Sequence, residues 1–129
     1  MKDSLVPGLE FEARYVVTKE MAPSHLPTVV LSTPYMIGLI ERTCLRGVAP
    51  HLDDGEVTVG THVCVSHRGA AYEGEEVVVR SRLTGVKGRR LTFEVEVQAP
   101  RGRISDGTHE RAAVDTARYE SRSGPAGDG

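Results

Sequence analysis

The pattern of apolar and polar positions predicts one long helix, in the stretch from Ser32 to Pro50. At about 100° per residue, the apolar side chains of this stretch gather on one side, and both of its arginines fall on the other. Ser32 or Thr33 can cap the first turn, and Pro34 suits the first helical position, where no N–H donor is needed. Pro50 marks the end of the helix, because proline cannot continue it.

One acidic residue, Glu41, falls inside the apolar side of this helix, between Val48 and Leu45 in angular order. A carboxylate without a partner is costly in apolar surroundings. The position therefore indicates a functional carboxylate, which could act as a general base on water or attack a carbonyl as a nucleophile. The alternative is a partly exposed glutamate, or one that is paired with an arginine for structural reasons.

Alternating apolar and polar residues predict five strands, one before the helix and four after it. Their predicted ranges are residues 9–18, 57–67, 76–83, 91–97 and 104–118. In the second strand the odd-numbered residues from Val57 to His67 should share one face. A bulge is expected in the last strand at Asp106-Gly107, where the pattern is interrupted. Residues 19–31 have no clear period and predict a loop or short irregular lid.

These elements predict an α+β fold in which one antiparallel sheet of five strands wraps around one long central helix. Such an arrangement hides the apolar side of the helix and the valine faces of the strands together. Because an open sheet leaves unpaired edges, two copies are expected to pair as a homodimer. The length of 129 residues suits one domain, predicted at residues 1–120. The polar residues 121–129 are predicted to form a disordered tail.

The composition argues against several kinds of partner. With 16 basic and 18 acidic residues the formal net charge is −2, and aromatic residues are few, so nucleic-acid binding is not expected. No apolar run approaches the roughly 20 residues of a membrane span, so no membrane partner is expected. The first residues lack the apolar region of a signal peptide, which predicts a cytoplasmic protein. Cys44 and Cys64 fall in apolar patterns and are predicted to be reduced core residues.

Several short motifs follow one another between about residue 30 and residue 115. In order, they are Thr33–Glu41 with its Gly38-Leu39-Ile40-Glu41 core, Ala49-Pro50 followed by Gly60-Thr61, Cys64-Val65-Ser66-His67, Val86-Lys87-Gly88-Arg89-Arg90-Leu91, and Gly107-Thr108-His109-Glu110-Arg111-Ala112. In their order and spacing they resemble the fluoroacetyl-CoA thioesterase family, which has the hot-dog fold. The resemblance implies a curved sheet around one helix and a hydrolase of short-chain acyl-CoA. It also implies an active site between two subunits. No cofactor is expected, since CoA is part of the substrate.

Three residues match the family's catalytic threonine, glutamate and histidine, namely Thr33, Glu41 and His67. Thr33 could also simply cap the helix, although a hydroxyl and free N–H groups at a helix N-terminus favour a developing oxyanion. With a base in reach, Thr33 could instead be a nucleophile. His67, at the end of a strand face of valines and threonines, is by itself typical of a core histidine. In a catalytic site it could orient Glu41 or water, or protonate the leaving thiolate.

Arg111 matches an arginine of the family's substrate pocket, although Arg111 and His109 could each lie on a solvated surface. Gly60 could let a substrate approach the backbone of its strand, or it could mark a bulge. No metal site is predicted, because His62 and His67 are an odd number of residues apart in one strand and should point to opposite faces.

The segment before the helix departs from the family. The family's fluoroacetyl-CoA enzyme has a longer lid with phenylalanines that gate a small, dry pocket, whereas Pro23–Leu31 is shorter here and contains no phenylalanine. The acyl group is therefore left open. Two other functions suit the same fold. One is a non-catalytic binding protein for acyl thioesters or another small ligand. The other is an enoyl-thioester hydratase, although the Asp/His pair of the hydratase motif is not found in this sequence.

Overall fold

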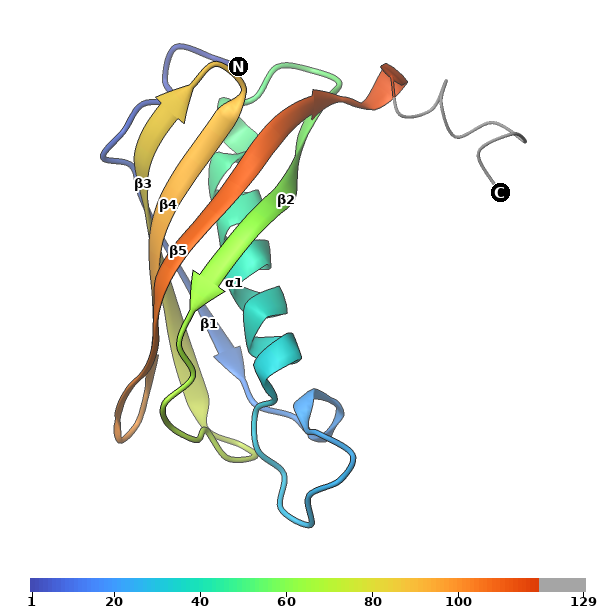
Figure 1. The fold of residues 1–129 in the computed structure, drawn as a ribbon, viewed down its shortest axis with the longest axis vertical. Coiled ribbons are helices and arrows are strands. Elements are labelled where there is room, and N and C mark those ends of the chain that lie inside the picture. Colours follow the sequence, from blue (N-terminus) through green and yellow to red (C-terminus); the bar gives the residue numbers. More distant parts are fainter. Residues whose placement is uncertain (119–129) are drawn as a thin grey trace, which may run out of the picture.

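The structure is a computed structural model that describes residues 1–118, and it contains one long helix packed against one antiparallel sheet (Figure 1). The helix, α1, spans Thr33–Val48. The sheet has five strands in the spatial order β1-β3-β4-β5-β2. Their bounds are β1 Glu10–Val16, β2 Glu56–Val65, β3 Glu76–Lys87, β4 Arg90–Ala99 and β5 Gly102–Asp115. This arrangement confirms the predicted α+β fold.

Two short 3-10 helices flank α1 in the sequence, namely η1 at Lys19–Met21 and η2 at Ala49–His51. No helix in the part of the chain that the structure describes has the length and apolar character needed to cross a membrane. The predicted domain limit at residue 120 and the predicted tail at residues 121–129 lie outside the described residues.

Helix α1 begins where the sequence predicts, and its cap is Ser32 rather than Thr33. The Ser32 hydroxyl accepts a hydrogen bond of 3.3 Å from the backbone N–H of Tyr35. This bond satisfies one of the N–H groups that the first turn leaves unpaired. Thr33 is the first helical residue and Pro34 the second, one position later than expected. The hydroxyl of Thr33 is therefore not needed to start the helix.

The core lies between α1 and the face of the sheet that curves around it. Fully buried members include Met36, Ile40, Cys44 and Val48 of α1 and Val77, Val79, Leu83, Leu91, Phe93 and Val97 of the sheet. The Cys44 thiol lies 3.1 Å from the Ser81 hydroxyl, and burial raises the pKa of this thiol to about 11. Cys44 is thus a reduced core residue, as predicted. Cys64 is also a free thiol, but its predicted place in the core is wrong, because it is exposed on the edge strand β2.

A bulge in β2 contradicts the expectation that the odd-numbered residues of this strand share one face. The pairing with β5 shifts between Gly60 and His62, so that Thr61 is an extra residue in β2. An extra residue reverses the alternation of side chains beyond it. Gly60 therefore lies opposite Arg111 before the bulge, and Val63 lies opposite His109 after it, on the same side of the sheet.

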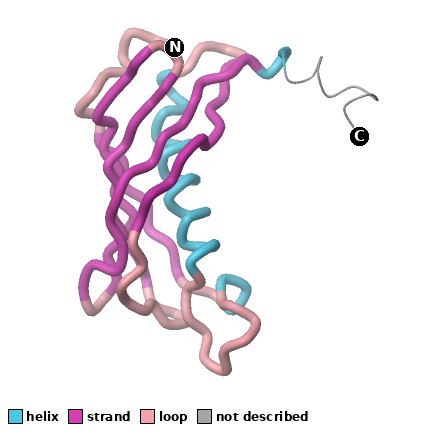
Figure 2. The backbone as a smooth tube through the Cα atoms, in the orientation of Figure 1, coloured by secondary structure: helices cyan, strands magenta, loops and turns pink. Residues whose placement is uncertain are grey.

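Two long connections lie together at the end of the sheet beside the start of α1 (Figure 2). One joins β1 to α1 and contains the predicted lid, and the other joins β2 to β3. The N–H of Leu31 donates to the carbonyl of Ala71 at 2.9 Å, and the N–H of Glu73 donates to the carbonyl of Val29 at 3.1 Å. The lid is therefore attached to the chain that follows β2.

The bulge that was expected at Asp106-Gly107 in β5 is absent. Asp106 pairs in register with Glu96 of β4, and Gly107 pairs with Val95, while the β4–β5 register shifts nearer to the turn that joins these strands. Gly107 instead has a φ of +154°, and a Cβ there would overlap the carbonyl oxygen of Cys64 in β2. The glycine that interrupted the sequence pattern thus marks a close approach of two strands.

We expect Gly107→Ala to lower the free energy of unfolding by about 2–5 kcal/mol, because it combines backbone strain with overlap against β2. Urea denaturation followed by circular dichroism measures this loss. The matched control is Gly85→Ala in β3, whose added methyl group would come no closer than 3.8 Å to Thr92. The control should change stability by less than about 1 kcal/mol. Equal losses in the two variants would contradict the explanation.

Candidate active site

Thr33 and His67 form the first pair of predicted site residues. The Oγ1 of Thr33 lies 2.7 Å from the Nδ1 of His67, which is hydrogen-bond distance. Thr33 is the first residue of α1, whereas His67 lies just beyond the end of β2 and not within the strand as predicted. The pairing of the two long connections brings these residues together, because it holds the segment after β2 beside the start of the helix.

The Thr33–His67 contact is possible because Ser32, and not Thr33, caps the helix. The hydroxyl of Thr33 is therefore available for His67. A hydroxyl and an imidazole nitrogen at this distance have the geometry of a nucleophile and its base. They can equally hold a shared proton beside a substrate carbonyl.

Glu41 and Arg111 form a second pair. The Nη1 of Arg111 donates to the Oε2 of Glu41 at 3.4 Å. The Arg111 side chain is only 4% exposed, whereas the Glu41 side chain is 44% exposed. The alternative that Arg111 lies on a solvated surface is therefore wrong, while its role in a substrate pocket stays a prediction. The Glu41 carboxylate thus contacts the buried Arg111 on one side and is open to solvent on the other.

Gly60 lies directly beneath the carboxylate. A Cβ at this position would overlap the Oε2 of Glu41, and His109 would be 3.4 Å away. The absence of a side chain lets Glu41 lie against the backbone of β2. The interpretation of Gly60 as the start of a bulge is confirmed. The close approach seen at this glycine is that of Glu41, and an approach by substrate stays a prediction.

Arg111 is held from the sheet by Thr58. The Nε of Arg111 donates to the Thr58 hydroxyl at 2.8 Å, and Nη2 donates to the Thr58 carbonyl at 2.9 Å. Burial lowers the pKa of the Arg111 guanidinium, while the charge of Glu41 opposes this change. Arginine remains a cation under such conditions. The site thus contains a buried positive charge beside a half-exposed negative one.

The structure does not place the predicted partners as one cluster. His67 was considered as a group that orients Glu41, but it contacts Thr33, and Arg111 contacts Glu41. Thr33 and Glu41 are separated by about 12 Å along the helix axis, at roughly 1.5 Å per residue. One helix therefore carries two part-sites, which we call the Thr33–His67 pair and the Glu41–Arg111 pair.

Two residues of this region were missed by the sequence analysis. His109 was treated as a possible surface residue, yet it is 1% exposed and contacts Arg111. Thr58, which holds Arg111, was not singled out. The spacing could have revealed both, because residues two apart on a strand share a face. His109 therefore accompanies Arg111, and Thr58 accompanies Gly60.

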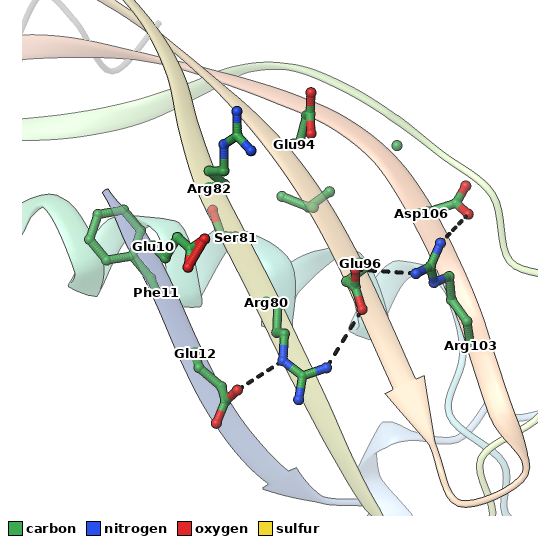
Figure 3. A pocket seen from close by; sticks show the side chains of 12 residues that line it. Glu10, Phe11, Glu12, Arg80, Ser81, Arg82, Glu94, Glu96, Arg103 and Asp106 are labelled. Atoms are coloured by element: carbon green, nitrogen blue, oxygen red, sulfur yellow. Dashed lines mark hydrogen bonds and ion pairs between the residues drawn. The ribbon is translucent and has the colours of Figure 1, made fainter. Parts of the chain in front are cut away.

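A separate cavity of about 570 Å³ lies on the sheet, away from both pairs (Figure 3). Arg80 projects there from the face of the sheet opposite to α1. It contacts Glu12 at 2.9 Å and Glu96 at 3.7 Å. Arg103 extends the series by contacting Glu96 at 3.4 Å and Asp106 at 3.6 Å. These five charged side chains pair with one another across four strands of the sheet.

Comparison with known proteins agrees with the fold and with the motifs. The family model described as the fluoroacetyl-CoA-specific thioesterase, FlK, matches residues 13–117. The chain belongs to this family. It is therefore a member of a family of thioester hydrolases, as the motifs predicted.

The match to FlK-family proteins extends over nearly the whole chain. The fluoroacetyl-CoA thioesterase of Streptantibioticus cattleyicolor is 35% identical over 131 residues, covering 95% of this chain and 94% of that protein. A crystal structure of an FlK variant has a TM-score of 0.88 at 33% identity, covering 95% of this chain and 97% of that chain. A thioesterase superfamily member from Thermus thermophilus has a TM-score of 0.83 at 27% identity, with coverages of 91% and 89%.

In this FlK-family thioesterase, we expect Gly60→Ala to lower kcat/KM for thioester hydrolysis by about 100-fold. The added methyl group displaces the Glu41 carboxylate, and a misplacement of about 1 Å within an active site can cost that much. Because the end of a glutamate side chain can move, the melting temperature should change little. Gly85→Ala, three strands away in the sheet, is the control and should keep wild-type kcat/KM. A Gly60→Ala enzyme with wild-type kcat/KM would show that the carboxylate position is unimportant.

Proposed function

We propose that this protein hydrolyses the thioester of a short-chain acyl-CoA, and that Thr33, Glu41 and His67 take part in the reaction. The proposal is supported by one observation above all, the half-exposed Glu41 carboxylate held between Arg111 and the bare backbone of Gly60. In the reaction, the oxygen of water bonds to the carbonyl carbon and the C–S bond breaks. The thiolate leaves as CoA and takes up a proton, and the acyl group leaves as the free acid.

Glu41 is the group that activates water or attacks the carbonyl carbon. Its Oε2 faces Arg111, and its Oε1 has no hydrogen-bond partner within residues 1–118. That second oxygen is available to take a proton from water or to form an acyl–enzyme bond. The 3.4 Å contact to Arg111 orients the carboxylate and leaves it free to react.

In the Thr33–His67 pair, Thr33 stabilises the negative charge that develops on the carbonyl oxygen, and His67 protonates the leaving thiolate. Nδ1 of His67 is hydrogen-bonded to the Thr33 hydroxyl, while its Nε2 makes no hydrogen bond within the described part of the chain. A histidine in this position can supply a proton to the departing thiolate. Thr33, at the positive end of α1, suits the developing oxyanion.

The working form is a homodimer that pairs through β2. Residues 57–65 contain no charged side chain, and Val57 and Val63 are 39% and 37% exposed. The other edge strand, β1, carries Glu10, Glu12 and Arg14, and charges of this kind prevent edge pairing. Because Gly60 and Glu41 lie at the β2 edge, a second copy paired there would cover the open side of the site.

Solved structures of FlK variants contain small acyl groups, which supports a small acyl group for the substrate of this protein. Crystal structures of FlK variants contain fluoroacetate with CoA in one case and acetyl-CoA in another. The two phenylalanines of this chain lie outside the lid, since the Phe11 ring packs at Gly47 and Phe93 is in the core. We propose that the lid, which lacks aromatic side chains, distinguishes fluoroacetyl-CoA from acetyl-CoA only weakly.

We expect Glu41→Gln and His67→Ala each to lower kcat by about 100-fold or more, because each removes a group that transfers a proton or bonds to the substrate. Release of free CoA thiol is measured with acetyl-CoA, fluoroacetyl-CoA and butyryl-CoA. Arg46→Gln, which removes an exposed charge from the last turn of α1, is the control and should keep wild-type turnover. If both site variants fold and retain full turnover, the assignment of these residues is wrong.

The same assay distinguishes the other functions that suit the fold. A binding protein would bind acyl-CoA without releasing thiol. An enoyl-thioester hydratase would remove the absorbance of an enoyl-CoA without releasing thiol. A ratio of kcat/KM below about tenfold between fluoroacetyl-CoA and acetyl-CoA is expected. Even a pocket that fits one small group closely gains only about 10- to 200-fold from it, and the lid of this chain has no phenylalanine to provide such a fit.

The dimer has its own test. We expect the wild-type protein to sediment as a dimer and Val63→Lys to shift it toward monomer, since the charge would lie in the paired edge. Val16→Lys places the same charge on the exposed end of β1, where Val16 is 51% exposed, and should leave the dimer intact. Analytical ultracentrifugation measures both. A monomeric wild-type protein would rule out pairing through β2.

A further inference from the structure

His109 is a buried histidine behind the Glu41–Arg111 pair. It lies on β5 two residues before Arg111, and it is 1% exposed. Its ring stacks on Phe93 with the centroids 6.0 Å apart and the planes at 26°. The ring therefore has no freedom to leave its position, and both of its nitrogens must find partners inside the protein.

The hydrogen bonds of His109 define its protonation state. Nδ1 lies 2.8 Å from the carbonyl oxygen of His62, which can only accept, so Nδ1 carries a proton. Nε2 lies 3.1 Å from the Nη1 of Arg111, which can only donate, so Nε2 is the acceptor. The ring is thus the neutral tautomer with its hydrogen on Nδ1.

The surrounding charges agree with a neutral ring. Burial lowers the pKa of His109, and the positive charge of Arg111 acts in the same direction. The carbonyl of His62 and the carboxylate of Glu41 oppose this change. A protonated His109 would place a second cation against Arg111 and would remove the only acceptor that its ring offers to the guanidinium.

We propose that His109 is a positioning residue of the active site, which acts by holding the guanidinium of Arg111 in the orientation that faces Glu41. This proposal rests on the function proposed above for Glu41. Nη1 of Arg111 serves two acceptors, His109 at 3.1 Å and Glu41 at 3.4 Å. With one hydrogen directed to His109, the other points toward the carboxylate.

A neutral acceptor is essential to this arrangement. A carboxylate in place of His109 would form its own ion pair with Arg111 and compete with Glu41 for the positive charge. An apolar side chain would leave a buried N–H of Arg111 without a partner, which is costly. The guanidinium of Arg111 would then rotate toward another acceptor. The Glu41 carboxylate would either shift with it or lose its hydrogen bond to Arg111.

The test compares His109→Leu, which removes the acceptor, with His109→Gln, which keeps a neutral one. We expect His109→Leu to lower kcat about 100-fold with KM changed less than about threefold, as a misplaced reacting group would. His109→Gln should recover kcat to within about tenfold of wild type. Ser105→Ala, a buried hydroxyl on the same strand with no hydrogen-bond partner in the described residues, is the control and should keep wild-type kcat.

A spectroscopic measurement on the wild-type protein supports or overturns the proposal even if His109→Leu does not fold. Nitrogen-15 NMR of the histidine side chains at pH 7 should show the neutral Nδ1–H tautomer for His109, and an imidazolium or the Nε2–H tautomer would overturn the proposal. So would wild-type kcat in a folded His109→Leu, or a His109→Gln as impaired as the leucine variant. Loss of activity in Glu41→Gln together with wild-type kcat in His109→Leu would refute this proposal alone. Wild-type turnover in Glu41→Gln would instead refute the function proposed for Glu41, and the positioning role with it.

Discussion

The burial of the Arg111 guanidinium between the sheet and α1 is the constraint on which the site depends. A charged group that is removed from water requires partners for its hydrogen bonds and its charge. Thr58 supplies two acceptors, His109 a third, and Glu41 the opposite charge. In the sequence alone, Glu41 is an anomaly on the apolar side of the helix. The structure explains its position, because Glu41 supplies the negative charge beside the buried guanidinium of Arg111.

The strand pairing that supports this cation depends on the bulge in β2. Before the bulge, Thr58 and Gly60 lie on the same side as Arg111. At the bulge, the carbonyl of His62 accepts the hydrogen bond of His109. A regular strand would continue the alternation and place these groups differently. The bulge is therefore part of the site. The Thr58 hydroxyl, before the bulge, accepts from Arg111, and the His62 carbonyl, at the bulge, accepts from His109.

Much of the fold could be predicted from the sequence, because helix and strand periods are local properties. The helix start at Ser32 and the alternation in β3 and β4 need only neighbouring residues to be recognised. A bulge at Gly60 was one of two interpretations of this glycine, and the sequence could not decide between them, since a single extra residue depends on how two distant strands pair. For the same reason Glu41 could be recognised as unusual, but its partner Arg111 depends on the register of β2 and β5 and was placed only by family resemblance.

The adjacent hydroxyls at the start of α1 have one more consequence. Ser32 provides the cap and Thr33 faces His67, so the start of the helix and the contact to His67 depend on different residues. In many helices one residue has both duties, and a change there alters folding and function at once. Here the two properties are separable. The side chain at Thr33, and with it the surroundings of His67, can therefore be changed while the helix keeps its own cap at Ser32.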